Sequence, residues 1–109
     1  GVVAGHISLE RWVEVCATAP ARLFGLPTKG SLNIGNDADI VVYDPHKTHV
    51  LSAATHHMNL DHSAYEGVEI IGGVRTVLSR GEVIVDGEQF LGRKGRGRYL
   101  RREVSQHVR

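Results

Sequence analysis

Apolar residues near the start of the chain follow the period of a helix. They recur at i, i+3, i+4 and i+7, as Leu9, Trp12, Val13 and Cys16. Ser8 stands just before them, where its hydroxyl can accept a hydrogen bond from an open backbone N–H. We therefore predict a helix that begins after Ser8 and that buries the Cys16 thiol on its apolar face.

A second helix is predicted at residues 19–24. Thr18 has the chemistry of a cap, and Pro20 is tolerated in the first helical turn because its missing N–H has no partner there. Gly25 can take the left-handed conformation that ends a helix, and Pro27 prevents continuation. Two consecutive helices are thus expected.

The pattern then changes to that of short strands. We predict strands at residues 32–34, 40–43, 49–51, 68–71, 74–79 and 82–85. The turn signals between them are Gly35-Asn36-Asp37, Asp44-Pro45, Gly72-Gly73, Arg80-Gly81 and Asp86-Gly87. The turn at Arg80-Gly81 predicts a hairpin, and residues 52–67 have too little periodicity to be more than a long surface connection.

The predicted elements have more apolar surface than they can cover by themselves. Residues 40–43 are a continuous apolar run, which is typical of a strand covered on both faces. Too few strands follow to cover both this run and the helix stripe. Since burying a Trp, Leu or Val side chain contributes roughly 1.5–3 kcal/mol, we expect a missing partner, in the same polypeptide or in another chain.

Composition and charge narrow the class of protein. The chain has 109 residues, 41% hydrophobic and 23% charged, which is ordinary for one small globular domain. No apolar run is long enough to span a bilayer, no signal-peptide pattern is present, and the single cysteine suits a reducing compartment. A cytoplasmic location is therefore expected, and the start at Gly1 without methionine is expected of a fragment or a processed product.

The net charge of +1 is unevenly distributed. Residues 92–109 hold seven of the 13 basic residues and one of the 12 acidic ones, so the first 91 residues hold six basic and eleven acidic residues. Three glycines and little apolar material predict that this tail is mobile by itself. Its charge predicts that it docks on an acidic surface. Nucleic acid is a weaker hypothesis, because only Tyr99 lies among the charges and no base-reading module is present.

The seven histidines raise the question of a metal site. His56, His57 and His62 lie close to Asp61, and His57 and Asp61 would share a face if the segment were helical. Neighbouring histidines point apart on a helix or strand, and no His-x-His or His-Glu-x-x-His pattern occurs, so we interpret them as solvated loop residues. The remaining histidines are isolated and expected at the surface: His6, His46, His49 and His107.

No other motif carries catalytic chemistry. The spacing of Asp37, Asp39 and Asp44 around turn residues favours bonds to neighbouring backbone N–H groups over acid–base catalysis. Ser8 and Ser63 have no general base at a recognisable spacing. Residues 92–97 are rich in glycine but lack the strand–loop–helix setting of a phosphate loop. We predict no catalytic, cofactor-binding or metal-binding residue in this chain.

Several segments in order resemble the amidohydrolase superfamily. Residues 18–26 are similar to its Thr-Asn-Pro-Ala-Lys-x-Phe-Gly-Leu segment, and residues 29–32 and 35–41 follow at about the expected distance. Residues 63–67 and 77–85 resemble the dihydropyrimidinase and D-hydantoinase branch. The resemblance implies a parent with a (β/α)8 barrel and a small β-sandwich. It assigns residues 1–28 to the terminal barrel helices, 29–91 to the C-terminal part of the sandwich and 92–109 to a basic tail.

The same resemblance implies an activity for the parent protein. Members of the branch hydrolyse the ring amide of dihydropyrimidines or hydantoins with two divalent metal ions, usually zinc, which polarise the carbonyl and lower the pKa of a bridging water. The family's metal ligands precede this segment, so no metal ion is expected on its residues. The fragment alone is expected to be inactive.

The resemblance also implies partners and leaves alternatives open. The missing barrel and sandwich strands of the same protein would cover the apolar faces, and family members are commonly homotetramers whose tail reaches a neighbouring subunit. A non-catalytic scaffold of the collapsin-response-mediator type has the same fold. A free-standing basic binding module is the third hypothesis, which a steep salt dependence of nucleic-acid affinity would support.

Overall fold

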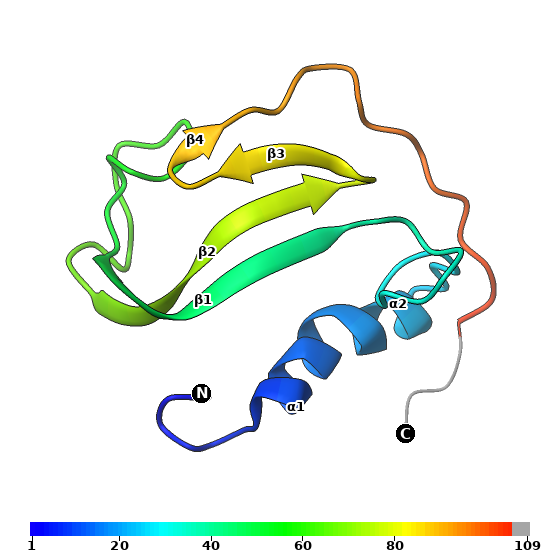
Figure 1. Ribbon diagram of the computed structural model, residues 1–109, viewed down its shortest axis with the longest axis horizontal. Coiled ribbons are helices and arrows are strands. Elements are labelled where there is room, and N and C mark those ends of the chain that lie inside the picture. Colours follow the sequence, from blue (N-terminus) through cyan, green and yellow to red (C-terminus); the bar gives the residue numbers. More distant parts are fainter. Residues whose placement is uncertain (106–109) are drawn as a thin grey trace. The chain divides into compact units, whose positions relative to one another are not determined.

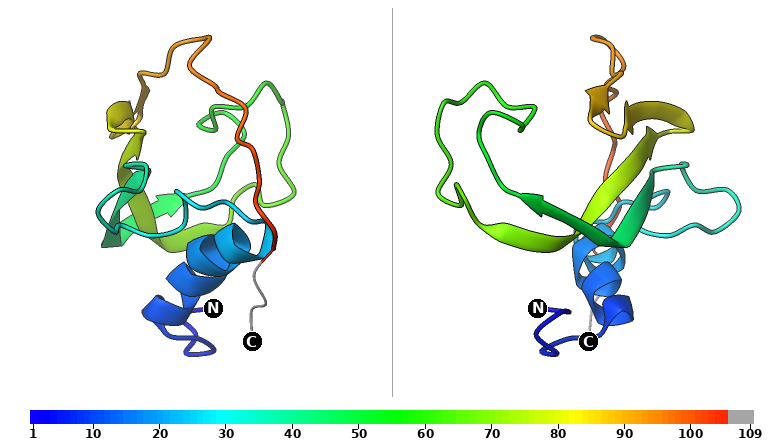
Figure 2. Two further views of the ribbon diagram at one scale, coloured as in Figure 1. Left: turned by 90° about the vertical axis from the view of Figure 1, so that its right-hand side faces the viewer. Right: turned by 60° about the vertical axis from the view of Figure 1, so that its left-hand side comes forward.

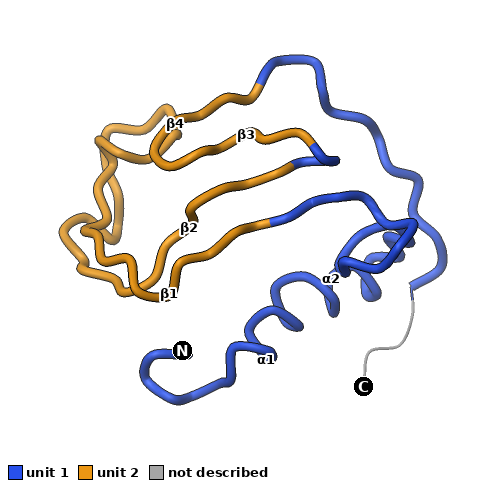
Figure 3. The backbone as a smooth tube through the Cα atoms, viewed as in Figure 1, with its two compact units in different colours: residues 1–40, 79–81, 93–109 blue, residues 41–78, 82–92 orange. Residues whose placement is uncertain are grey.

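The computed structural model describes residues 1–105 (Figure 1), so His107 and Arg109 lie outside the described residues. The order of elements is a helical segment followed by four strands. The described residues divide into two compact units (Figure 3). Of the described residues, unit 1 comprises 1–40, 79–81 and those from 93 onward, and unit 2 comprises 41–78 and 82–92. No helix within the described residues has both the length and the apolar character needed to cross a bilayer.

The helical segment begins where the sequence predicts. In α1 (Leu9–Val13) the backbone N–H of Arg11 donates to the Ser8 hydroxyl at 3.1 Å. The end is also confirmed, because Gly25 has a φ of +64° and its N–H donates to the Arg22 carbonyl at 3.2 Å. The N–H of Leu26 donates to the Ala21 carbonyl at 2.8 Å, which completes a Schellman motif.

The predicted break at Thr18 is wrong. A π-helical turn, η1 (Glu14–Thr18), joins α1 to α2 (Ala19–Leu23) without interruption, and Thr18 itself has helical angles. Its hydroxyl donates to the Gly30 carbonyl at 2.8 Å and caps nothing. The wider π turn lies just before Pro20, whose ring needs space at the carbonyl four residues earlier.

The strands form one antiparallel sheet with the order β1-β2-β3-β4 (Figures 1 and 2). They are β1 (Ile40–Val50), β2 (Glu69–Ser79), β3 (Glu82–Asp86) and β4 (Gln89–Phe90). The predicted hairpin at Arg80-Gly81 and the turn at Asp86-Gly87 are confirmed, whereas β4, which places Val85 opposite Phe90, was not predicted. Residues 52–67 form the expected long connection, which leaves β1 and returns to β2 (Figure 2).

Two predicted turns lie inside strands, so four predicted strands are only two. Asp44-Pro45 continues β1, which tolerates proline because it is an edge strand. Gly72-Gly73 continues β2, where the Tyr43 hydroxyl occupies the space of a Cβ on Gly72. Residues 32–34 form no strand, which is a further correction, and both apolar side chains of that segment are exposed.

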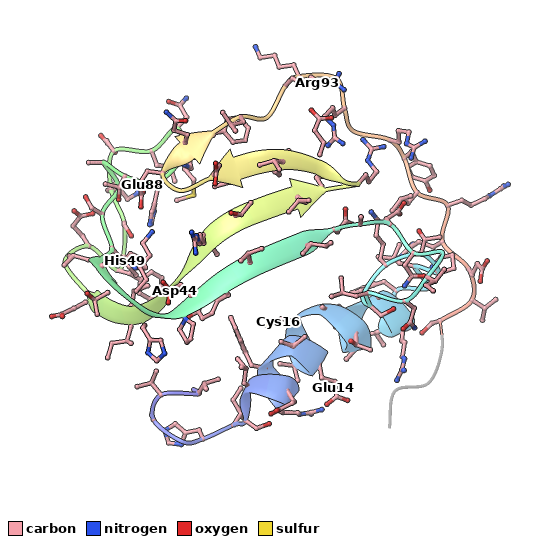
Figure 4. The ribbon with its side chains drawn as sticks, in the orientation of Figure 1. Glu14, Cys16, Asp44, His49, Glu88 and Arg93 are labelled. Atoms are coloured by element: carbon pink, nitrogen blue, oxygen red, sulfur yellow. The ribbon has the colours of Figure 1, made fainter. Side chains whose placement is uncertain are left out.

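The described residues have almost no core. Ala21, 7% exposed, is the only buried apolar residue among them. The predicted burial of Cys16 is wrong, since Cys16 is exposed along with Leu9 and Val13 on the helix stripe (Figure 4 labels Cys16). Val42 on β1 is 45% exposed. The uncovered apolar faces expected from the sequence are therefore present in the structure.

Candidate functional site

The histidines of the 52–67 connection do not form a metal centre in the described part of the chain. Within residues 1–105, no three His, Cys, Asp or Glu side chains lie where they could hold a metal ion. The segment is not helical, so the geometry that would align His57 with Asp61 does not arise. His62 Nδ1 instead lies 2.8 Å from the carboxylate of its neighbour Asp61, and both side chains are exposed. The His57 ring lies at a tilt against Phe90, with centroids 5.9 Å apart.

Unit 2 contains an open groove of about 570 Å³. Its mixed lining includes Tyr43, Lys47, His49, His56, Met58 and Glu88. Lys47 Nζ lies 2.9 Å from Glu88 Oε1, and this hydrogen bond and charge lower the pKa of Glu88. Figure 4 shows His49 on β1 and Glu88 in the β3–β4 turn. Two groove atoms, His49 Nδ1 and His56 Nδ1, are shielded from solvent and have no hydrogen-bond partner within the described residues.

Sequence reasoning missed this groove. Lys47 and Glu88 are 41 positions apart, and no local spacing connects them. The groove brings together ammonium, carboxylate and imidazole groups, so the arrangement can bind a polar group.

Unit 1 contains a network around Lys29. Its ammonium lies 2.5 Å from Asp39 Oδ2 and 3.1 Å from Asp37 Oδ2. Partial burial acts to lower the pKa of Lys29, but its hydrogen bonds to Asp39 and Asp37 outweigh burial and the net pKa is raised. The Thr28 hydroxyl donates to Asp37 Oδ2 at 2.8 Å, and the N–H of Arg80 donates to Asp39 Oδ1 at 2.9 Å.

Both carboxylates of this network are held in the ionised form. The hydrogen bond from Thr28, then that from Lys29, lowers the pKa of Asp37. The hydrogen bond from Lys29 is the main cause of the lowered pKa of Asp39, with burial opposing it. A general acid or base needs a pKa near the working pH. The pKa of each of these carboxyl groups is lowered, which moves it further from neutral pH. We therefore interpret the network as structural, since it joins the 28–39 loop to the Arg80-Gly81 turn.

Asp44 agrees with its predicted structural role, because its Oδ1 accepts the His46 backbone N–H at 2.9 Å (Figure 4 labels Asp44). Asp37 and Asp39 differ from the prediction in their partners. Asp39 bonds the backbone of Arg80, 41 positions away, and both contact Lys29. The prediction that the chain holds no catalytic or metal-binding residue stays a prediction.

Comparison with known proteins shows where the chain belongs. The sequence profile of the amidohydrolase family matches residues 4–85. The chain is 56% identical over 108 residues to a D-hydantoinase of Streptomyces coelicolor and 47% identical over 104 residues to a D-phenylhydantoinase of Escherichia coli. These matches include 98% and 94% of this chain, respectively, but only 23% of either relative.

Solved structures give the same result. The chain superposes on D-hydantoinase from Bacillus sp. AR9 with a TM-score of 0.94 at 46% identity, covering 99% of this chain and 24% of that one. Dihydropyrimidinase from Brevibacillus agri gives a TM-score of 0.94 at 44% identity over the same shares. These matches confirm the predicted fold class, a helical segment and sheet strands of the barrel-and-sandwich architecture. The chain spans about a quarter of the relatives it matches, and it belongs to the amidohydrolase family.

Proposed function

We propose that the chain is the C-terminal segment of a cyclic amidohydrolase of the hydantoinase or dihydropyrimidinase type. The whole enzyme would hydrolyse the ring amide bond of 5-substituted hydantoins or of dihydropyrimidines. The observation that carries this proposal is the agreement in sequence and backbone with D-hydantoinases and a dihydropyrimidinase over nearly all of this chain.

The described residues would support the reaction without taking part in it. Asp37 and Asp39 pair with Lys29, and the described residues contain no cluster of three or more His, Cys, Asp or Glu side chains that could hold a metal ion. We propose that the two divalent ions, zinc in our proposal, bind residues of the parent protein that this chain does not contain. Such ions supply Lewis-acid polarisation of a carbonyl. The role of this chain would be to complete the fold that holds those residues.

The missing part of the protein would also cover the exposed apolar surface. We propose that residues 1–28 are terminal barrel helices, that residues 29–91 complete a β-sandwich, and that residues 92–109 are a basic tail. The exposed Leu9, Val13 and Val42 support this division, because each would be buried by a barrel or by further sandwich strands.

A cytoplasmic homotetramer is proposed for the whole protein. The single cysteine supports the compartment, and the basic tail against an acidic remainder supports contact with a neighbouring subunit. Deletion of residues 92–109 from the intact polypeptide should lower its sedimentation coefficient. An unchanged coefficient would count against this use of the tail.

Ring opening by the intact polypeptide tests the proposed activity. We expect hydrolysis of a 5-substituted hydantoin or of dihydrouracil that is lost after chelation and restored by Zn²⁺. Activity that survives complete metal removal would contradict the proposed chemistry. A metal-loaded intact protein that opens neither ring would favour the non-catalytic scaffold.

A further inference from the structure

The Arg80-Gly81 turn contains an unusual backbone. Arg80 has a φ of +47° and is the one non-glycine residue with a positive φ among the described residues. Gly81 follows with a φ of +79°, so both central turn residues are left-handed, as in a type I′ hairpin. Asn, Asp and Gly are preferred there because a longer side chain is strained in this conformation. The presence of arginine at this position therefore requires a structural explanation.

The backbone hydrogen bonds of the turn do not explain why arginine is present. Arg80 N–H donates to Asp39 Oδ1 at 2.9 Å, and Gly81 N–H donates to the Ala38 carbonyl at 2.9 Å. Asparagine or glycine at position 80 would make the same backbone bond. Only the side chain is specific to arginine, and its Nη2 donates to the backbone carbonyl of Arg96 in the tail.

The tail returns the contact. Arg96 Nη2 donates to the Ser79 carbonyl at 2.7 Å, so each arginine bonds the backbone of the other's segment. Arg96 is half-buried, whereas the other described basic residues of the tail are exposed: Arg93, Lys94, Arg98, Arg101 and Arg102. Arg96 thus differs from these neighbours in burial.

The tail has a second anchor further along. Glu103 N–H donates to the Gly25 carbonyl at 2.8 Å. Gly25 lies so close to this point that a Cβ on it would overlap the Glu103 carbonyl oxygen. This anchor is made by backbone atoms, whereas the contacts of Arg80 and Arg96 depend on their side chains.

We propose that Arg80 and Arg96 form a reciprocal clip that holds the tail on its own subunit as a strap, and that arginine occupies the left-handed position 80 for this purpose. The strap runs between the clip and the Gly25–Glu103 bond. The other described basic side chains of the strap are exposed, and the strap does not depend on any reaction that the whole protein catalyses.

Hydrogen exchange of the intact polypeptide tests the clip. Arg80→Asn keeps a residue suited to the turn but removes the guanidinium, and Arg96→Gln breaks the clip from the other side. Lys94→Gln is the matched control, because it also removes one tail charge but lies outside the clip. We expect the amides of residues 97–105, including that of Glu103, to exchange about tenfold faster in both clip variants and unchanged in the control.

Hydrogen exchange of the β2 and β3 amides distinguishes the proposed clip from a requirement of the turn itself for arginine. In Arg80→Asn these strands should exchange at the original rate or more slowly. Faster exchange of β2 and β3 would show that arginine serves the turn and would overturn the proposal. Unchanged tail exchange in both clip variants would overturn it as well, as would equal acceleration by Lys94→Gln.

Discussion

Gly30 lies where the loop after the helix returns to pack on the π turn. Its φ is +84°, and a Cβ at this position would lie 2.5 Å from Ala21 Cβ and 2.8 Å from the Ala17 carbonyl oxygen. Gly35 has a similar φ of +95°, but a Cβ there would meet nothing within 4 Å. The two glycines thus share the conformational requirement and differ only in available space.

Gly30→Ala should therefore cost much more stability than Gly35→Ala. A left-handed alanine costs roughly 1–2 kcal/mol at either position. Overpacking adds roughly 1–3 kcal/mol at Gly30, since the neighbours are a helix backbone and the buried Ala21. The expected loss in the free energy of unfolding is then about 2–5 kcal/mol for Gly30→Ala and about 1–2 kcal/mol for Gly35→Ala.

The measurement is the unfolding midpoint of the intact polypeptide for wild type and both variants. The Gly30→Ala midpoint should fall clearly below that of Gly35→Ala. Equal midpoints would refute the packing of this loop against the helix, because the difference between the variants contains only the steric contribution.

Two further predictions concern the ion pair between Asp39 and Lys29 and the burial of Val42. Asp39→Asn should destabilise the intact protein at neutral pH by about 0.2–1 kcal/mol, because the pair with Lys29 is partly exposed and solvent screens it. The lowered pKa of Asp39 gives stability that is fully present above about pH 3.8 and is lost as the pH falls through the lower folded-state pKa, so the two proteins should converge once the pH is below that folded-state pKa; a gap that is unchanged after Asp39 is protonated would contradict the ion pair. Val42→Glu should cost roughly 1.5–3 kcal/mol in the intact protein although Val42 is 45% exposed here, because the rest of the protein is proposed to cover it. A neutral Val42→Glu would show that this strand face is solvated.

Features that depend on one local hydrogen bond or one backbone angle could be predicted from the sequence. Ser8 caps α1 because its hydroxyl reaches an N–H three residues on, and Gly25 ends α2 because few other residues accept its φ. The Arg80-Gly81 turn was predicted from its turn signal between two predicted strands, although the left-handed conformation of Arg80 was not.

The failures occurred where a distant partner decides the local conformation. Thr18 has the chemistry of a cap, but its hydroxyl is used by Gly30, twelve positions away. Gly72 indicates a turn in the sequence, but in the structure it lies inside β2, where Tyr43 from the neighbouring strand packs against it. Cys16 was expected inside because helix periodicity marks which residues share a face, and it does not say what covers that face.

The candidate sites show the same limit. The groove and the Lys29 network join positions up to 41 residues apart, so spacing could not reveal them. Family motifs were informative because they encode such long-range packing indirectly.

We propose that this chain completes a cyclic amidohydrolase whose chemistry lies on other residues. Hydrolysis of a 5-substituted hydantoin, measured under one condition for the metal-loaded intact polypeptide and for the purified 109-residue chain, tests it most directly. We expect ring opening by the intact polypeptide and none by the chain alone. Ring opening by the isolated chain, or none by the intact polypeptide, would contradict it.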